Sequence, residues 1–226
     1  MNAIVLRPLR FSDDVEAMRR FLELLGLRSR IELERGGWID MPAGAGMVAL
    51  HDAATSSTGG RPGQTTLSFE ADDIDELAER LRAAGHEDAT VWDEAYGRVL
   101  RVEGPGAVSV WVDERSDDLY GYRLHKSEPD DRWSVRLVLT TDDPDGWRSL
   151  LRHFGQGDGG LIKIDPGPAY DVQLGFRTTE GLDAVEARLS EAGFVVEAVE
   201  AGPAVDDRAA GFVVRDPDGC IVPVRG

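Results

Sequence analysis

The chain contains two clear copies of one short unit, in which an alternating apolar segment is followed by an amphipathic segment and a glycine. The first copy spans 65–85 and the second spans 171–193. Apolar residues recur at every second position and then at every third or fourth position, which predicts a strand followed by a helix. Weaker copies occur at 4–26 and 135–155. A unit of this size cannot bury its own apolar face, so the copies are expected to pair.

The four copies divide the chain into four modules. In modules one and two, turns rich in Gly and Pro separate three apolar segments after the helix, which predicts the order strand–helix–strand–strand–strand. Module three leaves room for one strand after its helix, at 160–164, and module four ends in a hairpin over 211–224. We therefore expect an α+β fold of paired βαβββ modules in two tandem domains, the second shortened. The predicted boundaries are 1–114 for the first domain, 115–131 for a linker in which 119–122 can add a short strand, and 132–226 for the second domain.

The predicted helices carry boundary signals in the sequence. Ser12 or Asp13 is the expected N-cap of the first helix, because short polar side chains satisfy the free N–H groups of a first turn. Gly26, Gly85 and Gly193 follow the last apolar residue of their helices, where glycine accepts the left-handed conformation of a helix stop.

Composition excludes several classes of partner. The net charge of −17 argues against nucleic acid, whose phosphates need clustered cations. No apolar run approaches the roughly 20 residues that cross a bilayer, so no membrane partner is expected. The single cysteine, Cys220, forms no internal disulfide, which is typical of a reducing compartment. A cytoplasmic location is predicted, with an acidity that favours solubility and, more weakly, cationic ligands.

The arrangement resembles the vicinal oxygen chelate superfamily, which includes glyoxalase I, bleomycin-resistance proteins and extradiol dioxygenases. The resemblance rests on segments that recur in register over nearly the whole chain: Asp13 through Leu25-Gly26-Leu27, Asp72-Asp73-Ile74-Asp75 through Ala84-Gly85, and Asp216-Pro217-Asp218-Gly219. It implies a glyoxalase-like fold in which two βαβββ modules curl together and their sheets enclose a cleft.

The resemblance also implies where metal ligands would lie. Members with a metal usually place His on the first strand of a module and Glu on the last strand, with ligands at about 2.0–2.2 Å from the metal. Aligning the four copies places poor ligands at these positions: Leu6, Ala49, Thr66, Val110, Val135, Leu174 and Pro223. Of the four histidines, His51 alone is expected near the cleft, while His86, His125 and His153 lie on unrelated segments. No metal and no other cofactor is therefore expected.

Strand alternation predicts the side chains that line the cleft of the first domain. With Leu6 facing inward, Arg10 does so too, and the same alternation from Ala49, Thr66 and Val110 adds further residues. Arg10 and Glu70 either pair with each other or bind a carboxylate or amine of a ligand, and Trp38 either stacks on a planar ligand or packs in the core. The predicted ligand-binding residues, in a mostly apolar cleft, are Arg10, Trp38, Met47, His51, Thr66, Ser68, Glu70 and Val110.

The leading hypothesis is a metal-free small-molecule binding protein of the bleomycin-resistance type, which sequesters a drug or metabolite and is not an enzyme. The alternative is a lyase, isomerase or dioxygenase that uses a nonstandard metal set around His51 and Glu70, or metal-free acid–base chemistry. A regulatory or scaffold role, in which the shortened second domain only covers the first, is a third hypothesis. The expected partner is a small-molecule ligand, and dimerisation of the chain stays open.

Overall fold

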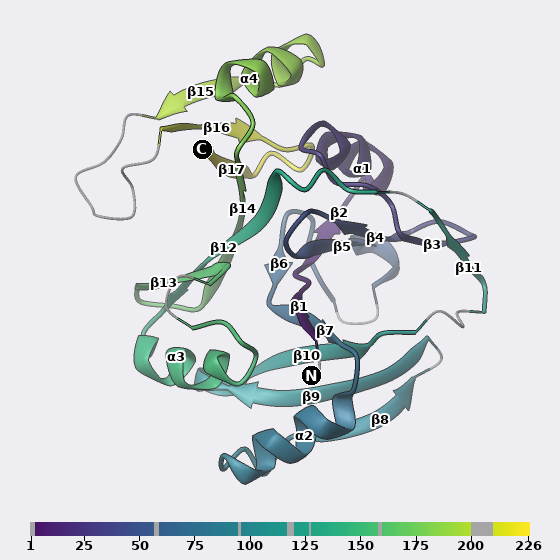
Figure 1. The fold of residues 1–226 in the computed structure, drawn as a ribbon, viewed down its shortest axis with the longest axis vertical. Coiled ribbons are helices and arrows are strands. Elements are labelled where there is room, and N and C mark those ends of the chain that lie inside the picture. Colours follow the sequence, from purple (N-terminus) through teal and green to yellow (C-terminus); the bar gives the residue numbers. More distant parts are fainter. Residues whose placement is uncertain are drawn as a thin grey trace.

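The computed structural model of the chain describes residues 3–56, 59–94, 96–116, 120–126, 128–157, 160–199 and 210–226. In these residues it contains three β-sheets and four α-helices (Figure 1). None of the described helices has the length and apolar character needed to cross a membrane. The α+β class expected from the repeats is confirmed.

The N-terminal half of the chain has the predicted module order twice. The first module consists of β1 (Ile4–Leu6), β2 (Leu9–Ser12), α1 (Val15–Leu24), β3 (Ile31–Leu33), β4 (Trp38–Pro42) and β5 (Met47–Asp52). The second consists of β6 (Thr65–Thr66), β7 (Ser68–Ala71), α2 (Ile74–Ala83), β8 (Thr90–Glu94), β9 (Gly97–Gly104) and β10 (Val108–Glu114). Short 3-10 turns lie at Ala53–Thr55 and Pro105–Ala107. Figure 1 shows α1 against the sheet that contains β4 and β5, and α2 against the sheet that contains β8 to β10.

The first strand of each of these two modules is broken, which the repeats did not predict. Strand β1 pairs with β7, whereas β2 pairs with β5 and β6. The breaks fall at Arg7–Pro8 and at Leu67, and Pro8 has no N–H to donate to a ladder. Each first strand therefore contributes to two sheets: sheet A, in the order β1-β7-β10-β9-β8, and sheet B, in the order β11-β3-β4-β5-β2-β6.

The C-terminal half forms one continuous sheet, sheet C, in the order β13-β12-β14-β17-β16-β15. Its first strands are unbroken, and β12 pairs with β14 over eight residues from Trp133 to Thr140. Its elements are β12 (Trp133–Thr141), α3 (Pro144–Arg152), β13 (Ile162–Pro166), β14 (Asp171–Thr178), α4 (Leu182–Glu191), β15 (Val196–Val199), β16 (Gly211–Arg215) and β17 (Ile221–Arg225). Strand β15 was not predicted from the sequence.

Between the halves, β11 (Tyr122–Leu124) pairs with β3 at the edge of sheet B. The short strand expected at 119–122 therefore starts at Tyr122 and runs beyond the expected range, and Leu119 lies outside the described residues. The predicted linker thus contributes a strand to the N-terminal half.

The helix boundaries follow the local signals of the sequence with one correction. The N-cap of α1 is Asp14, whose carboxylate accepts from the N–H of Ala17 at 2.8 Å, and not Ser12 or Asp13. Asp73 and Asp143 cap α2 and α3 in the same way, at 2.9 Å each. The stops after the four helices are glycines with positive φ, as expected for left-handed stops: Gly26, Gly85, Gly155 and Gly193.

The two halves share one cluster of buried apolar side chains. Phe69 of sheet A stacks on Phe154, which follows α3, with ring centroids 4.5 Å apart. Trp133 of β12 lies over Gly26, where a Cβ atom would come within 2.5 Å of its ring. Because such contacts join segments from both halves, we expect the halves to unfold together.

Candidate functional site

Sheets A and B each have one face packed on helices and one face turned away from them. Val110 and Val112 of β10 are buried in the same core as the apolar residues of α2, so the residues between and beside them lie on the opposite face. Cross-strand register then places Asp113 beside Glu70, and Trp111 beside Ser68. In sheet B it places Trp38 beside His51, and Asp40 beside Ala49. We call these two surfaces the inner faces.

A buried network of charges joins the two inner faces. Arg7 donates to both carboxylate oxygens of Asp40, at 3.1 and 3.2 Å, and also to Asp113. Arg30 donates to Glu70 at 3.0 Å and to Asp40 at 3.3 Å, and Arg115 donates to Glu70 at 2.9 Å. Arg7, Asp40 and Glu70 are each at most 5% exposed. The network, defined as Arg7, Arg30, Asp40, Glu70, Asp113 and Arg115, therefore satisfies its own charges.

The network sets the protonation of its members. Burial raises the pKa of Glu70, but hydrogen bonds and charges from Arg30 and Arg115 hold this pKa below its usual value. Burial lowers the pKa of Arg7, and the carboxylates of Asp40 and Asp113 more than offset this, so its pKa lies above the usual value. For Asp113 burial outweighs the opposing effect of Arg7, and the pKa is raised. Arg7 and Glu70 are accordingly charged at neutral pH.

Aromatic side chains surround the network. The guanidinium carbon of Arg7 lies 5.2 Å from the ring centroid of Trp38, within the range of a cation–π contact. His51 meets Trp38 edge-on at 5.2 Å, and Trp92 meets Trp111 in the same way at 5.4 Å. Near the network, Tyr96 is 48% exposed, and burial together with the charge of Asp113 raises its pKa to about 12. These rings are partly open to solvent, whereas Arg7, Asp40 and Glu70 are buried.

Most of the predicted ligand-binding residues do lie on the inner faces. Trp38, Met47 and His51 share the inner face of sheet B, to which Thr66 belongs through its pairing with Leu9. Ser68 and Glu70 lie on the inner face of sheet A. Their role toward a ligand stays a prediction.

Two of the predicted positions are wrong in orientation. Val110 and Leu6 pack in the helix-covered core, so they do not line an inner face. Trp111, the residue after Val110, faces inward in its place. Arg7 occupies the inward position expected of Leu6 and was missed, because the predicted register of the first strand was off by one residue. Val5, Arg7 and Leu9 face inward on both sides of the break.

Arg10 also lies elsewhere than predicted. It pairs with Asp216 in the turn between β16 and β17, and its Nη2 lies 3.6 Å from Asp218. Arg10 and Asp216 are 3% and 5% exposed, so this is a buried ion pair between the two halves of the chain. The expected pair of Arg10 with Glu70 is wrong, because Glu70 binds Arg30 and Arg115.

The donor set does not fit the metal that the resemblance implies. In the described part of the chain, no three His, Cys, Asp or Glu side chains are placed to hold a metal ion. The three carboxylates of the network each bind arginine. The Nδ1 atom of His51 lies 2.7 Å from the carbonyl oxygen of Asp52. Guanidinium groups thus stand among carboxylates from three strands where a metal would need free oxygen or nitrogen donors.

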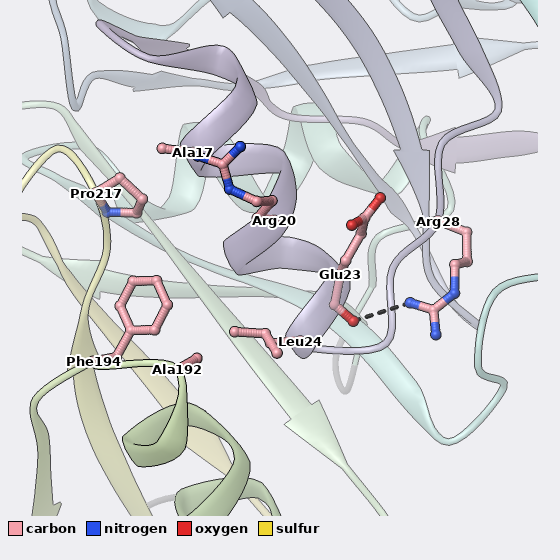
Figure 2. A pocket seen from close by; sticks show the side chains of 8 residues that line it. All are labelled: Ala17, Arg20, Glu23, Leu24, Arg28, Ala192, Phe194 and Pro217. Carbon is pink, nitrogen blue, oxygen red and sulfur yellow. Dashed lines mark hydrogen bonds between the residues drawn. The ribbon is translucent and has the colours of Figure 1, made fainter.

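A groove of about 870 Å³ lies between α1 and the C-terminal half. Figure 2 shows residues of α1 on one side and residues that follow α4 on the other. Contacts at both ends of α1 hold this helix against the C-terminal half, which forms the other wall of the groove. Ser12 donates to Asp218 at 3.0 Å, and Arg188 donates to the carbonyl of Leu24 at 2.8 Å. The lining residues are Ala17, Arg20, Glu23, Leu24, Arg28, Ala192, Phe194 and Pro217.

Glu70 predicts a measurable pH dependence. Its pKa is lower in the folded chain than in the unfolded one, so its contribution to stability is complete above the unfolded pKa of about 4.5 and is lost as the pH falls through the folded value. Urea unfolding between neutral pH and about pH 3 should show a smaller acid-induced loss of stability in Glu70→Gln than in the parent chain. The exposed Glu87→Gln is the control and should follow the parent. Equal pH profiles for the parent and Glu70→Gln would contradict the assignment.

The sequence of the chain matches no family model and no curated protein. Its structure is similar to a catechol 2,3-dioxygenase, with 15% identity, a TM-score of 0.65, and 98% of this chain and 86% of the other covered. It is also similar to a 2,2',3-trihydroxybiphenyl 1,2-dioxygenase from Sphingomonas wittichii, with 15% identity, a TM-score of 0.63, and 98% and 88% covered. A third similar structure is a Mn(II)-bound glyoxalase from Novosphingobium aromaticivorans, with 15% identity, a TM-score of 0.59, and 99% and 82% covered. These similarities show the fold alone, and the expected glyoxalase-like fold is confirmed.

Proposed function

We propose that this chain is a metal-independent protein that binds a small organic molecule. The observation that carries the proposal is the network of Arg7, Arg30 and Arg115 with three carboxylates on the inner faces. Because these arginines already neutralise the three carboxylates, the free negative donors that a divalent cation needs are missing from the network. Sequestration of a drug or metabolite, as in the bleomycin-resistance branch that the sequence resembles, requires the fold but no metal.

The aromatic side chains of the inner faces support binding of an organic molecule. Small-molecule sites combine apolar and aromatic walls with a few placed polar groups. Here Trp38, Trp92 and Trp111 are partly exposed, and Tyr96 and Tyr122 carry hydroxyls close to the network. A planar ligand can stack on these rings.

Two measurements on the whole chain test the proposal. Elemental analysis of protein purified without a metal-binding tag should find no stoichiometric Zn, Mn, Fe or Ni. A panel of aromatic drugs and metabolites should contain a ligand that raises the free energy of unfolding by about 2.7 kcal/mol at 100 times its Kd. Trp111→Ala should lower the affinity for this ligand. Tyr120→Ala should not, because the ring of Tyr120 is fully exposed. A panel without any stabilising ligand would count against the proposal.

The second candidate is an enzyme, and the similar solved structures favour it because two are dioxygenases and one is a Mn(II)-bound glyoxalase. Such an activity here requires a nonstandard metal set around His51 and Glu70, or acid–base chemistry without a metal. Asp113, with its raised pKa, is then the candidate proton donor. Stoichiometric metal in the purified chain would favour this candidate over the binding protein.

A further inference from the structure

Sheet C has one face buried and one face open. Along β12 the buried Trp133, Val135 and Leu137 alternate with the half-buried Ser134, Arg136 and Val138. The buried residues share a core with the apolar side chains of α3 and α4, so these helices cover only that face. In the N-terminal half the broken first strands create a second sheet, whereas β12 and β14 stay in one sheet. The open face of sheet C therefore has no partner sheet among the described strands.

Three arginines on neighbouring strands meet on this open face. Arg177 of β14 lies directly beside Arg225 of β17 in the register, and Arg136 of β12 lies beside Gly175, two residues from Arg177. Adjacent strands are about 4.8 Å apart, and diagonal neighbours about 7 Å. The arginine cluster, defined as Arg136, Arg177 and Arg225, is thus compact enough for one ligand to reach all three side chains.

The cluster lacks the carboxylates that the arginines of the inner faces have. None of its members forms an ion pair with an Asp or Glu of the described residues. Arg136 donates to the carbonyl of Gly160 at 2.8 Å, and Arg177 to the carbonyl of Gly226 at 3.2 Å. The Nε of Arg136 and the Nη1 of Arg225 are buried and have no hydrogen-bond partner. Because a buried donor without an acceptor is unfavourable, these nitrogens favour an acceptor that the described residues do not supply.

The positive charges also act on one another. Burial, followed by the charge of Arg177, lowers the pKa of Arg136 below its usual value. The chain as a whole carries a net charge of −17, and the register of the sheet brings these positive charges together. A bound anion offsets the repulsion between the arginines. Its oxygens accept paired N–H hydrogen bonds from the guanidinium groups, a geometry that carboxylates and phosphates favour.

Apolar side chains border the cluster. Val138 of β12, Val213 of β16 and Pro223 of β17 are half-buried on the same face. At Gly175, beside Arg136 in the register, a Cβ atom would lie 3.0 Å from the Pro223 ring, so glycine leaves room for this ring on the face. The face thus offers an apolar surface next to three cations.

We propose that the arginine cluster binds the carboxylate or phosphate group of a small organic molecule whose apolar part lies on Val138, Val213 and Pro223. This assignment rests on the proposed function and names the ligand class and a site in the C-terminal half. It differs from the site on the inner faces, where the arginines already have carboxylate partners.

Titration calorimetry of the whole chain with benzoate, phenyl phosphate and neutral benzyl alcohol tests the assignment. We expect saturable binding of at least one of the two anions and none of benzyl alcohol, and the preferred anion identifies the group. Arg136→Gln and Arg177→Gln should each raise the Kd for that anion by about tenfold or more, because each removes a charge-assisted hydrogen bond. Arg225→Lys, which keeps the charge, should raise the Kd less than Arg225→Gln. The exposed Arg20→Gln of α1 should leave the affinity unchanged.

Three results would overturn the assignment. They are no binding of either anion at millimolar concentration, unchanged binding in the folded double variant Arg136→Gln/Arg177→Gln, and a dimer that buries this face and is lost in the same variant. Unfolding midpoints measured for every variant separate lost binding from lost folding. If an aromatic ligand still binds through Trp111 while the anions do not bind, the site assignment fails and the proposed function survives; if neither binds, both fail.

Discussion

Replacing Arg7 by methionine should lower the free energy of unfolding by about 3–5 kcal/mol, the range found when one partner of a buried ion pair is removed. Arg7 is 5% exposed and binds Asp40, which is 2% exposed, as well as Asp113. Methionine has a similar reach but no charge, so it leaves two carboxylates buried close together with one cation fewer. The remaining contact of Asp40 with Arg30, at 3.3 Å, offsets only part of this change.

Urea unfolding at neutral pH measures the effect, and Arg20→Met on α1 is the matched control. Arg20 is exposed, so its replacement should change stability by no more than about 0.5 kcal/mol. If Arg7→Met lost less than about 1 kcal/mol, the network would behave like a screened surface pair. The interpretation that the network is a buried ion-pair network between sheets A and B would then be wrong.

Much of the fold follows from local signals in the sequence. The alternating segments, the amphipathic helices and the glycine stops predict the module order, and the structure has that order in both modules of the N-terminal half. The strand breaks were not predicted, because the alternation of apolar residues continues on both sides of them. Pro8 is the one local signal of a break, since a proline cannot pair within a central strand. No comparable signal marks the break at Leu67.

An error of one residue in the predicted register explains why the candidate site was predicted only in part. Side chains alternate with a period of two, so an error of one position turns a whole strand over. Starting the alternation from Leu6 placed Leu6 and Arg10 on the inner face, whereas Leu6 lies in the core and Arg10 pairs with Asp216. That partner is 206 residues away in the sequence, and no local pattern indicates it. Glu70 was placed correctly because the alternation that starts from Thr66 has the right register, which is kept across the break at Leu67.

The shortened third module had a consequence that the sequence pattern did not show. With one strand after α3, the C-terminal half cannot form two sheets, and β12 stays paired with β14 along its length. The same alternation that buries Val135 then leaves Arg136 on an open face. The loss of strands therefore explains both the single sheet and the exposure of the arginine cluster.

Replacing Phe154 by alanine should also lower the free energy of unfolding by about 3–5 kcal/mol, because the change leaves a cavity between the two halves. Phe154 is 1% exposed and stacks on Phe69 at 14° between the ring planes. Val195→Ala is the control, since Val195 is 64% exposed and its truncation leaves no cavity. In a double-mutant cycle with Phe69→Ala, the two losses should fall short of additivity by about 0.5–1.5 kcal/mol, the energy of an aromatic pair.

The unfolding curve of Phe154→Ala also tests whether the halves are one cooperative unit. Phe69 belongs to sheet A and Phe154 follows α3, yet both lie in one continuous core. A cavity in a shared core weakens both halves, so tryptophan fluorescence and far-UV circular dichroism should show one transition at the same lowered urea midpoint. Two separate transitions, with the N-terminal half unfolding at the midpoint of the parent chain, would contradict a shared core. The expected single transition follows from packing, because α3 and Phe154 after it complete the core of sheet A.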